Sequence, residues 1–106
     1  MKIVIGGDFY PGRRWEKKVL ENPASIWSKA VLDFMNDADL RIVNLETPLT
    51  TSDSAIKKIG PNLKCHPDVI KTLTFADINL VTLANNHIYD FGNKGMVETK
   101  GVLKSN

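Results

Sequence analysis

The sequence has a single cysteine, Cys65, and no long hydrophobic run, and these two shortages exclude several classes of protein. One cysteine cannot form an internal disulfide bond or a CxxC metal knuckle, so the chain needs no oxidising compartment. Its apolar stretches are far shorter than the roughly 20 residues of a transmembrane helix. The start, MKIVIGGD, lacks the apolar core of a signal peptide. We therefore expect a soluble, cytoplasmic chain without a membrane span.

The chain also lacks an excess of charge of either sign. Fourteen lysines and arginines stand against twelve acidic residues, which gives a formal net charge of +2. These charges are scattered, whereas a nucleic-acid-binding surface needs a concentrated basic face, so we expect no nucleic acid partner. The small basic groups Arg13-Arg14 with Lys17-Lys18, and Lys57-Lys58, are interpreted as solvated surface.

At 106 residues, of which 42% are hydrophobic, the chain has the size of one small domain, residues 1–106. Runs rich in β-branched residues predict strands at 3–5, 40–43 and 78–83. Apolar residues at helical spacing predict helices at 25–35, with Ser25 as the N-cap, at 67–73 and at 95–103. Strands that alternate with helices predict an α/β fold with a mostly parallel sheet. Residues 47–62 have no period and predict a mobile loop.

Polar side chains follow each predicted strand. Asp8 comes after the first, Glu46 after the second, and Asn85-Asn86-His87 with Asp90 after the third. The carboxyl ends of parallel strands meet at one edge of a sheet, so we expect these groups to converge. Carboxylate, amide and imidazole groups together suit a divalent metal ion. Asp8, Glu46, Asn86 and His87 are therefore the candidate metal ligands.

Each of these residues also has a structural interpretation. Asp8 suits a turn after two glycines, and Glu46 suits an exposed loop. Asn85-Asn86 can cap backbone groups, and a lone histidine such as His87 is commonly structural. Asp90 can cap the following helix or fasten the NNH loop. The sequence alone leaves these alternatives open.

Three phrases together resemble a known family. They are Gly7-Asp8 near the start, NLETPLT at 44–50, and LANNHIYDFG at 83–92 followed by Gly95 and Thr99. The chain resembles the bacterial capsule-synthesis protein CapA, or poly-γ-glutamate capsule, family, a branch of the calcineurin-like metallophosphoesterases. The resemblance implies a fold with two β-sheets flanked by helices and a two-metal centre at the strand ends.

The resemblance also assigns roles to residues of this chain. It implies that Asp8 is the first metal-binding aspartate, Glu46 the acid of the second motif and Asn86 the metal-binding amide. It implies that His87 assists the leaving group, and Asp90 stands with His87 as a candidate catalytic residue. The implied cofactor is a divalent metal, Mn, Zn or Fe, and the implied substrate is a phosphoester or an anionic polymer.

The chain departs from the family pattern in two respects. A typical phosphoesterase opens with Asp-x-His, but Tyr10 stands at the third position here, and the chain has only two histidines, His66 and His87. The pattern of the family also continues beyond Leu103. Residues 1–106 therefore resemble the amino-terminal half of such a domain. We expect this chain alone to lack a complete active site.

A three-stranded parallel sheet also leaves an edge and an apolar flank unpaired, so we expect self-association or a second polypeptide that supplies the missing half. The functional expectation is a metal-dependent phosphoesterase-type hydrolase, or part of one, in the synthesis or export of a capsule polymer. The alternative is a non-catalytic component that binds a polymer or a partner. Family members are often membrane-associated.

Overall fold

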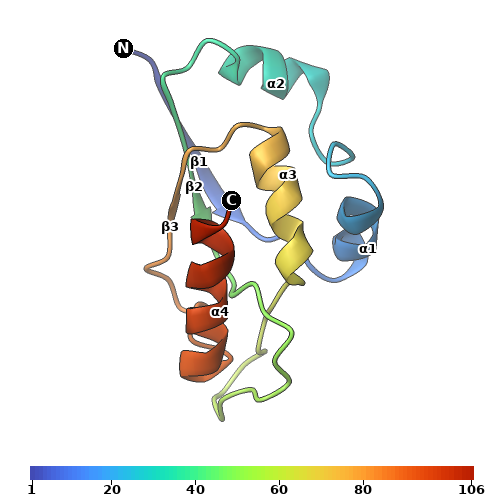
Figure 1. Cartoon of the computed structure of the whole chain (residues 1–106), viewed down its shortest axis with the longest axis vertical. Helices are drawn as coiled ribbons and strands as arrows, with labels where there is room; N and C mark the ends of the chain where they lie inside the picture. Colours follow the sequence, from blue (N-terminus) through green and yellow to red (C-terminus); the bar gives the residue numbers. More distant parts are fainter.

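A three-stranded parallel sheet organises the chain. In a computed structural model that describes residues 1–106, β1 (Ile3–Phe9), β2 (Leu40–Leu45) and β3 (Leu80–Thr82) lie in the order β1-β2-β3 (Figure 1). The α/β fold with a parallel sheet is thus confirmed. β1 and β2 extend further than the sequence predicts, and β3 is shorter than its apolar run.

Helices fill each connection between the strands. Between β1 and β2 lie α1 (Arg14–Glu21) and α2 (Lys29–Met35), and between β2 and β3 lie the short 3-10 helix η1 (Pro67–Val69) and α3 (Ile70–Phe75). After β3 comes α4 (Gly92–Lys104). The predicted helices at 67–73 and 95–103 are confirmed, whereas α1 was not expected. None of the helices has the length and apolar character needed to cross a bilayer.

The predicted start of the helix at 25–35, which is α2 in the structure, is wrong. The helix begins at Lys29, and its N-cap is Ser28, whose hydroxyl accepts a hydrogen bond from the Val31 N–H at 3.2 Å. Ser25 instead donates its hydroxyl to the Lys18 carbonyl at the end of α1. Trp27 lies outside the helix because its ring stacks on Phe9 and its indole N–H donates to Thr72. Tertiary contacts therefore override the helical period at the start of this segment.

A bulge in β1 decides which side chains share a face of the sheet. Ile5 pairs with Ile42 and Asp8 pairs with Asn44, so β1 uses one residue more than β2 across this step. The extra residue falls in Gly6-Gly7 and shifts the alternation of side chains along β1. As a result, Asp8 lies on the same face as Ile5, and Phe9 lies on the opposite face with Leu45.

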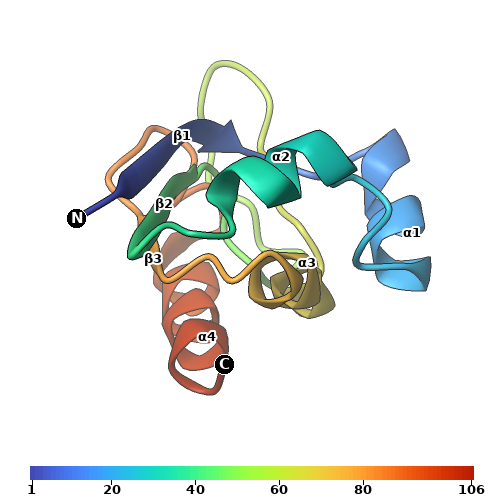
Figure 2. The ribbon, with the colours of Figure 1, turned by 90° about the horizontal axis from the view of Figure 1, so that it is seen from above.

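Helices pack against one face of the sheet and leave the other face uncovered (Figure 2). On one face, strand and helix residues form a buried core cluster of Val19, Val43, Leu45, Leu49, Cys65, Val69, Ile70 and Leu73. Figure 2 shows α2 and α3 on this side of the sheet and no helix over the other. We call that other side the open face; in order across the sheet, its apolar residues are Ile3, Ile5, Leu40, Ile42 and Leu80.

The open face leaves large apolar side chains in contact with solvent. Ile3, Ile5 and Leu80 are 48%, 73% and 43% exposed. The face turns polar at the carboxyl ends of the strands, where Asp8, Asn44 and Thr82 lie in one row. Parallel sheets are normally covered on both faces, so this chain presents an unusual amount of uncovered sheet.

Residues 46–66, the β2–η1 loop, lie at the end of the molecule where the strands finish (Figure 1). Regular structure is absent here, as expected, apart from a single bridge between Leu49 and Cys65. The expectation of a mobile loop is wrong for residues 47–50, which are all buried. The backbone of Thr50 donates to the Cys65 carbonyl at 2.9 Å, and Cys65 donates to the Pro48 carbonyl at 3.0 Å.

Candidate functional site

A chain of side-chain hydrogen bonds joins the ends of all three strands. Asn44 at the end of β2 donates to Asp8 Oδ1 at 2.7 Å. The Asn44 Oδ1 atom accepts hydrogen bonds from Thr82 on β3 at 3.0 Å and from Asn85 at 3.2 Å. Asn44 thus connects the first aspartate to the NNH segment. The polar groups converge at one edge of the sheet because parallel strands end there together.

Asn85 holds the turn that follows β3. Its Oδ1 atom accepts hydrogen bonds from the backbone N–H groups of His87 and Ile88, at 3.1 and 2.9 Å, and its Nδ2 also donates to the Leu45 carbonyl at 2.8 Å. The structural interpretation of the first asparagine is therefore confirmed. The neighbouring Asn86 differs, because its side chain is exposed and makes no hydrogen bond. Asn86 remains available to a ligand.

The imidazole of His87 is coupled to the carboxylate of Asp90. The Nδ1 atom of His87 lies 2.7 Å from Asp90 Oδ2, and the side chains of these residues are 12% and 1% exposed. A carboxylate accepts hydrogen bonds only, so Nδ1 carries the proton and donates a hydrogen bond to Asp90. The other ring nitrogen, Nε2, has no partner in the chain. This pairing leaves Nε2 as the ring nitrogen that is free to contact a ligand.

Asp90 also anchors the β2–η1 loop. It accepts a hydrogen bond from the Leu63 N–H at 2.7 Å and forms an ion pair with Lys58. Asp90 does not cap α4, because the residue at the N-cap is Phe91. Burial alone would raise the pKa of Asp90, but hydrogen bonds from Lys58, Leu63 and His87 hold that pKa below its usual value. Asp90 is therefore a buried carboxylate.

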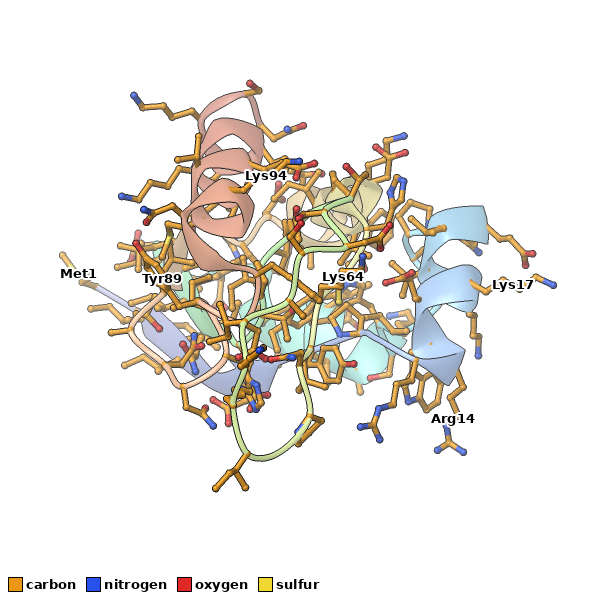
Figure 3. All side chains as sticks on the ribbon, turned by 90° about the horizontal axis from the view of Figure 1, so that it is seen from below. Met1, Arg14, Lys17, Lys64, Tyr89 and Lys94 are labelled. Atoms are coloured by element: carbon orange, nitrogen blue, oxygen red, sulfur yellow. The ribbon has the colours of Figure 1, made fainter.

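Lys58 corrects the interpretation of Lys57-Lys58 as solvated surface. The side chain of Lys58 is only 21% exposed, and its Nζ atom lies 3.3 Å from His87 Nδ1 in addition to its contact with Asp90. The sequence carried no signal for this contact, because Lys58 lies 32 residues before Asp90 in a loop without a period. Figure 3 shows the molecule from the end at which the strands finish, with this loop in the foreground and Tyr89 labelled in the turn before α4.

The remaining candidate ligand, Glu46, lies directly after β2. Its backbone N–H donates to the Phe9 carbonyl at 3.2 Å, which keeps it beside the end of β1. The Glu46 carboxylate is half-buried and makes no hydrogen bond or ion pair. Beside Asp8, a cavity of about 470 Å³ is lined by aromatic and small residues, which include Phe9, Tyr10 and Trp15.

The side chains that most often ligate metals do not gather in one place in this chain. No three His, Cys, Asp or Glu side chains lie close enough together to hold a metal ion. Burial raises the pKa of Cys65 to about 12, so its thiol stays protonated at neutral pH. Burial is also the main cause that raises the pKa of Tyr10, which stands where a histidine ligand was expected. A metal centre at Asp8, Glu46, Asn86 and His87 stays a prediction.

Helix α4 fixes the segment that follows Glu46. The Thr99 hydroxyl accepts a hydrogen bond from the Leu49 N–H at 2.9 Å and donates to the Gly95 carbonyl at 2.7 Å. Glu98 accepts hydrogen bonds from the Thr50 hydroxyl and from the Thr51 N–H. The NLETPLT segment therefore packs directly against the part of α4 that carries Gly95 and Thr99.

A sequence model of the family described as bacterial capsule synthesis protein PGA_cap matches residues 2–106. The chain belongs to this family. Two proteins of Mycobacterium tuberculosis, from strains CDC 1551 and H37Rv, are each named a probable polyglutamine synthesis accessory protein. Both are 35% identical to the chain over 78 residues, which make up 73% of this chain and 20% of theirs. The matched segment is thus about a fifth of the length of these relatives.

Family membership confirms the resemblance that the three phrases indicated. The phrase NLETPLT begins at the end of β2, and the phrase LANNHIYDFG follows β3. A hydrogen bond between Asn44 and Asn85 joins the two phrases. Sequence reasoning quoted Asn44 and Asn85 but did not select Asn44, which is the centre of the hydrogen-bond chain. Asn44 could have been selected from the sequence, because a polar residue near the end of a predicted interior strand needs a hydrogen-bond partner.

Proposed function

We propose that this PGA_cap chain carries part of the active site of a metal-dependent phosphoesterase-type hydrolase that acts in capsule or polyglutamate synthesis or export. One observation carries the proposal. Asn44 and Asn85 connect the end of β1, where Asp8 lies, to the turn after β3 that carries the His87-Asp90 couple. An acid and an oriented imidazole at the carboxyl edge of a parallel sheet are suited to hydrolysis.

In this proposal, His87 moves a proton at Nε2. Asp90 accepts a hydrogen bond from the Nδ1–H group, which orients the ring and leaves Nε2 to exchange a proton with the attacking water or the leaving group. Asp8 has one carboxylate oxygen, Oδ1, bonded to Asn44, and its second oxygen is free to contact a ligand. The exposed amide of Asn86, beside His87, adds a neutral oxygen donor.

The metal requires ligands beyond those of this chain. Because three suitable side chains do not gather here, no step of a reaction is assigned to a metal. The relatives are about five times longer than the matched segment, and we propose that further polypeptide completes the site. The chain by itself is expected to bind a divalent ion only weakly.

The test of this proposal locates weak metal binding. Mn²⁺ is added to the ¹⁵N-labelled chain, and paramagnetic broadening of backbone NMR signals is measured. We expect broadening to begin at Asp8, Asn86 and His87, and to be lost there in Asp8→Ala and reduced in Asn86→Ala. Asp33→Ala is the matched control, since Asp33 is an exposed acid on α2. Equal broadening in all variants would remove the metal site from the proposal.

The hydrolytic part is tested separately with an aryl phosphate diester and Mn²⁺, with the chain alone and within a longer PGA_cap protein. We expect negligible turnover by the chain alone. Turnover by the longer protein should be lost when the residue matching His87 is changed to alanine. Full activity of that variant would show that His87 has no part in the chemistry.

A second candidate function is a non-catalytic component that binds an anionic polymer or a partner. It is favoured by a cavity of about 580 Å³ whose lining includes Arg13, Lys64 and His66 and a single acid, Glu16. Lys64, labelled in Figure 3, also lies 5.0 Å from the centre of the Phe91 ring. Metal-independent binding of polyglutamate, weakened by Arg13→Ala, would favour this function over hydrolysis.

The open face is the surface of this chain at which we expect another polypeptide to bind. Its exposed apolar residues, Ile3, Ile5 and Leu80, need cover of the kind that parallel sheets normally have. Since the relatives continue far beyond the matched length, we propose that further polypeptide of the same protein covers this face. Without it, two copies of the chain are expected to associate through the same face.

A further inference from the structure

Three side chains from two distant segments meet behind the exposed nitrogen of His87. Lys58 comes from the β2–η1 loop, whereas His87 and Asp90 come from the turn before α4. Asp90 is almost completely buried, and Lys58 is its only cationic side-chain partner in an ion pair. The proposed chemistry uses His87 and Asp90 but assigns nothing to Lys58.

We propose that Lys58 is a positioning residue that fixes the imidazole of His87 in one orientation and one tautomer, with the proton on Nδ1 and the lone pair on Nε2. The inference deepens the proposed function, and it rests on that function for its consequence in catalysis. The structural claim itself concerns only residues of this chain.

The geometry at Nδ1 supports a single tautomer. Asp90 Oδ2 lies 2.7 Å from Nδ1, whereas Lys58 Nζ lies 3.3 Å from the same atom. An acceptor and a donor both face Nδ1, so only one of them can form a hydrogen bond with it at a time. The shorter contact is to the carboxylate, and a lone pair on Nδ1 would face the lone pairs of Oδ2. Nδ1 is therefore the protonated nitrogen.

Lys58 contributes by fixing the carboxylate. It binds Oδ1 of Asp90, while Oδ2 receives both the Leu63 N–H and the His87 ring. With each oxygen engaged, the carboxylate cannot rotate without breaking a charge-assisted hydrogen bond. The imidazole that donates to Oδ2 is thereby fixed as well, in the way that outer partners orient the rings of functional histidines.

The loop holds Lys58 in place through backbone contacts on both sides of it. The Ile56 N–H donates to the Asp90 carbonyl at 2.9 Å, and Leu63 donates to the Asp90 side chain at 2.7 Å. Asn62 also donates to the Ile56 carbonyl at 3.0 Å, which closes the loop around Lys58. The lysine is thus tied to the same residue that it orients.

The consequence for the proposed reaction is a defined order of proton transfer. With a lone pair on Nε2, His87 enters the reaction as a proton acceptor or a ligand. It can donate a proton to a leaving group only after Nε2 has taken one up.

The experiment is a long-range ¹H–¹⁵N NMR measurement of the His87 ring nitrogens at one neutral pH, with no metal or substrate present. His87→Gln identifies the signals, since the chain has only one other histidine, His66. We expect wild type to show one tautomer, with Nδ1 protonated and Nε2 bare. Lys58→Met should give averaged signals from both tautomers, and Lys58→Arg should restore the single form. Lys57→Met, at the exposed neighbouring position, should behave as wild type.

Two results would overturn the inference. A dominant Nε2–H form in folded wild-type protein would do so without any variant, even if Lys58→Met failed to fold. An unchanged tautomer in folded Lys58→Met would show that Asp90 needs no help from Lys58. Neither result depends on metal binding or turnover, so the failure of this inference is distinguishable from failure of the proposed function.

Discussion

Replacement of Asp90 by alanine should lower the stability of the chain more than any change at an exposed acid. Asp90 is 1% exposed and accepts hydrogen bonds from Lys58, Leu63 and His87. Removal of one partner of a buried ion pair costs about 3–5 kcal/mol. Lys58 is 21% exposed and can partly reach water, so we expect a loss of about 3 kcal/mol, near the lower limit. This is a large fraction of the roughly 5–15 kcal/mol that stabilises a domain.

The assay is urea unfolding at neutral pH, followed by tryptophan fluorescence, since Trp27 stacks on Phe9 in the folded chain. Asp33→Ala is the control, because its ion pair with Lys29 is exposed and should contribute less than about 1 kcal/mol. In the double variant with Lys58→Met, the loss should be smaller than the sum of the two single losses. A loss below about 0.5 kcal/mol for Asp90→Ala would refute the ion-pair argument, since that is the range of ordinary surface changes.

The pH dependence gives a second measurement of the same contact. The contacts of Asp90 hold its pKa in the folded chain below its usual value of about 3.9. Its contribution to stability is therefore complete above the unfolded pKa and is lost as the pH falls through the lower, folded pKa. Between about pH 5 and the acid limit, Asp90→Asn should lose less stability than wild type. Parallel curves for the two proteins would contradict this expectation.

Two further predictions concern the sheet. Gly6→Ala should lower the free energy of unfolding by about 1–2 kcal/mol, because the added Cβ would lie 3.1 Å from Val43 Cγ1 in the core. Gly7→Ala should change the free energy of unfolding little, because its Cβ would meet no atom within 4 Å. Equal losses for the two variants in thermal unfolding would show that the bulge is not tightly packed. Ile5→Lys should weaken self-association of the chain in sedimentation velocity, since Ile5, at 73% exposure, is more exposed than Ile3 and Leu80 on the open face. A compact wild-type monomer at high concentration would exclude association through that face.

The sequence predicts the order of the elements well because each strand has its own β-branched run. The register of β1 could not be predicted, because the pair Gly6-Gly7 does not show that the strand holds one extra residue there. Without the bulge, alternation would turn Asp8 toward the core instead of the open face. The helix α1 was missed because it is only eight residues long and mostly charged, with Val19 as its one buried residue.

The candidate site was predictable to a similar, partial degree. The topological rule for strand ends correctly brought Asp8 and the NNH segment to one edge, since the rule depends only on parallel strands. It could not identify Lys58, whose place depends on the path of a loop with no regular structure. It also could not distinguish Asn85 from Asn86, because the role of each depends on the conformation of a single turn.

That distinction between the two asparagines favours a binding role for this edge. Asn85 uses its oxygen for two backbone N–H groups and its nitrogen for Asn44 and Leu45, so it satisfies the turn by itself. The turn therefore gains no hydrogen bond from a second amide, yet Asn86 stands exposed beside it. The same contrast holds between the two nitrogens of His87, of which Nδ1 is bonded internally and Nε2 is free. Groups that the fold leaves unbonded, held in place by neighbours that are fully bonded, are arranged as a ligand site requires.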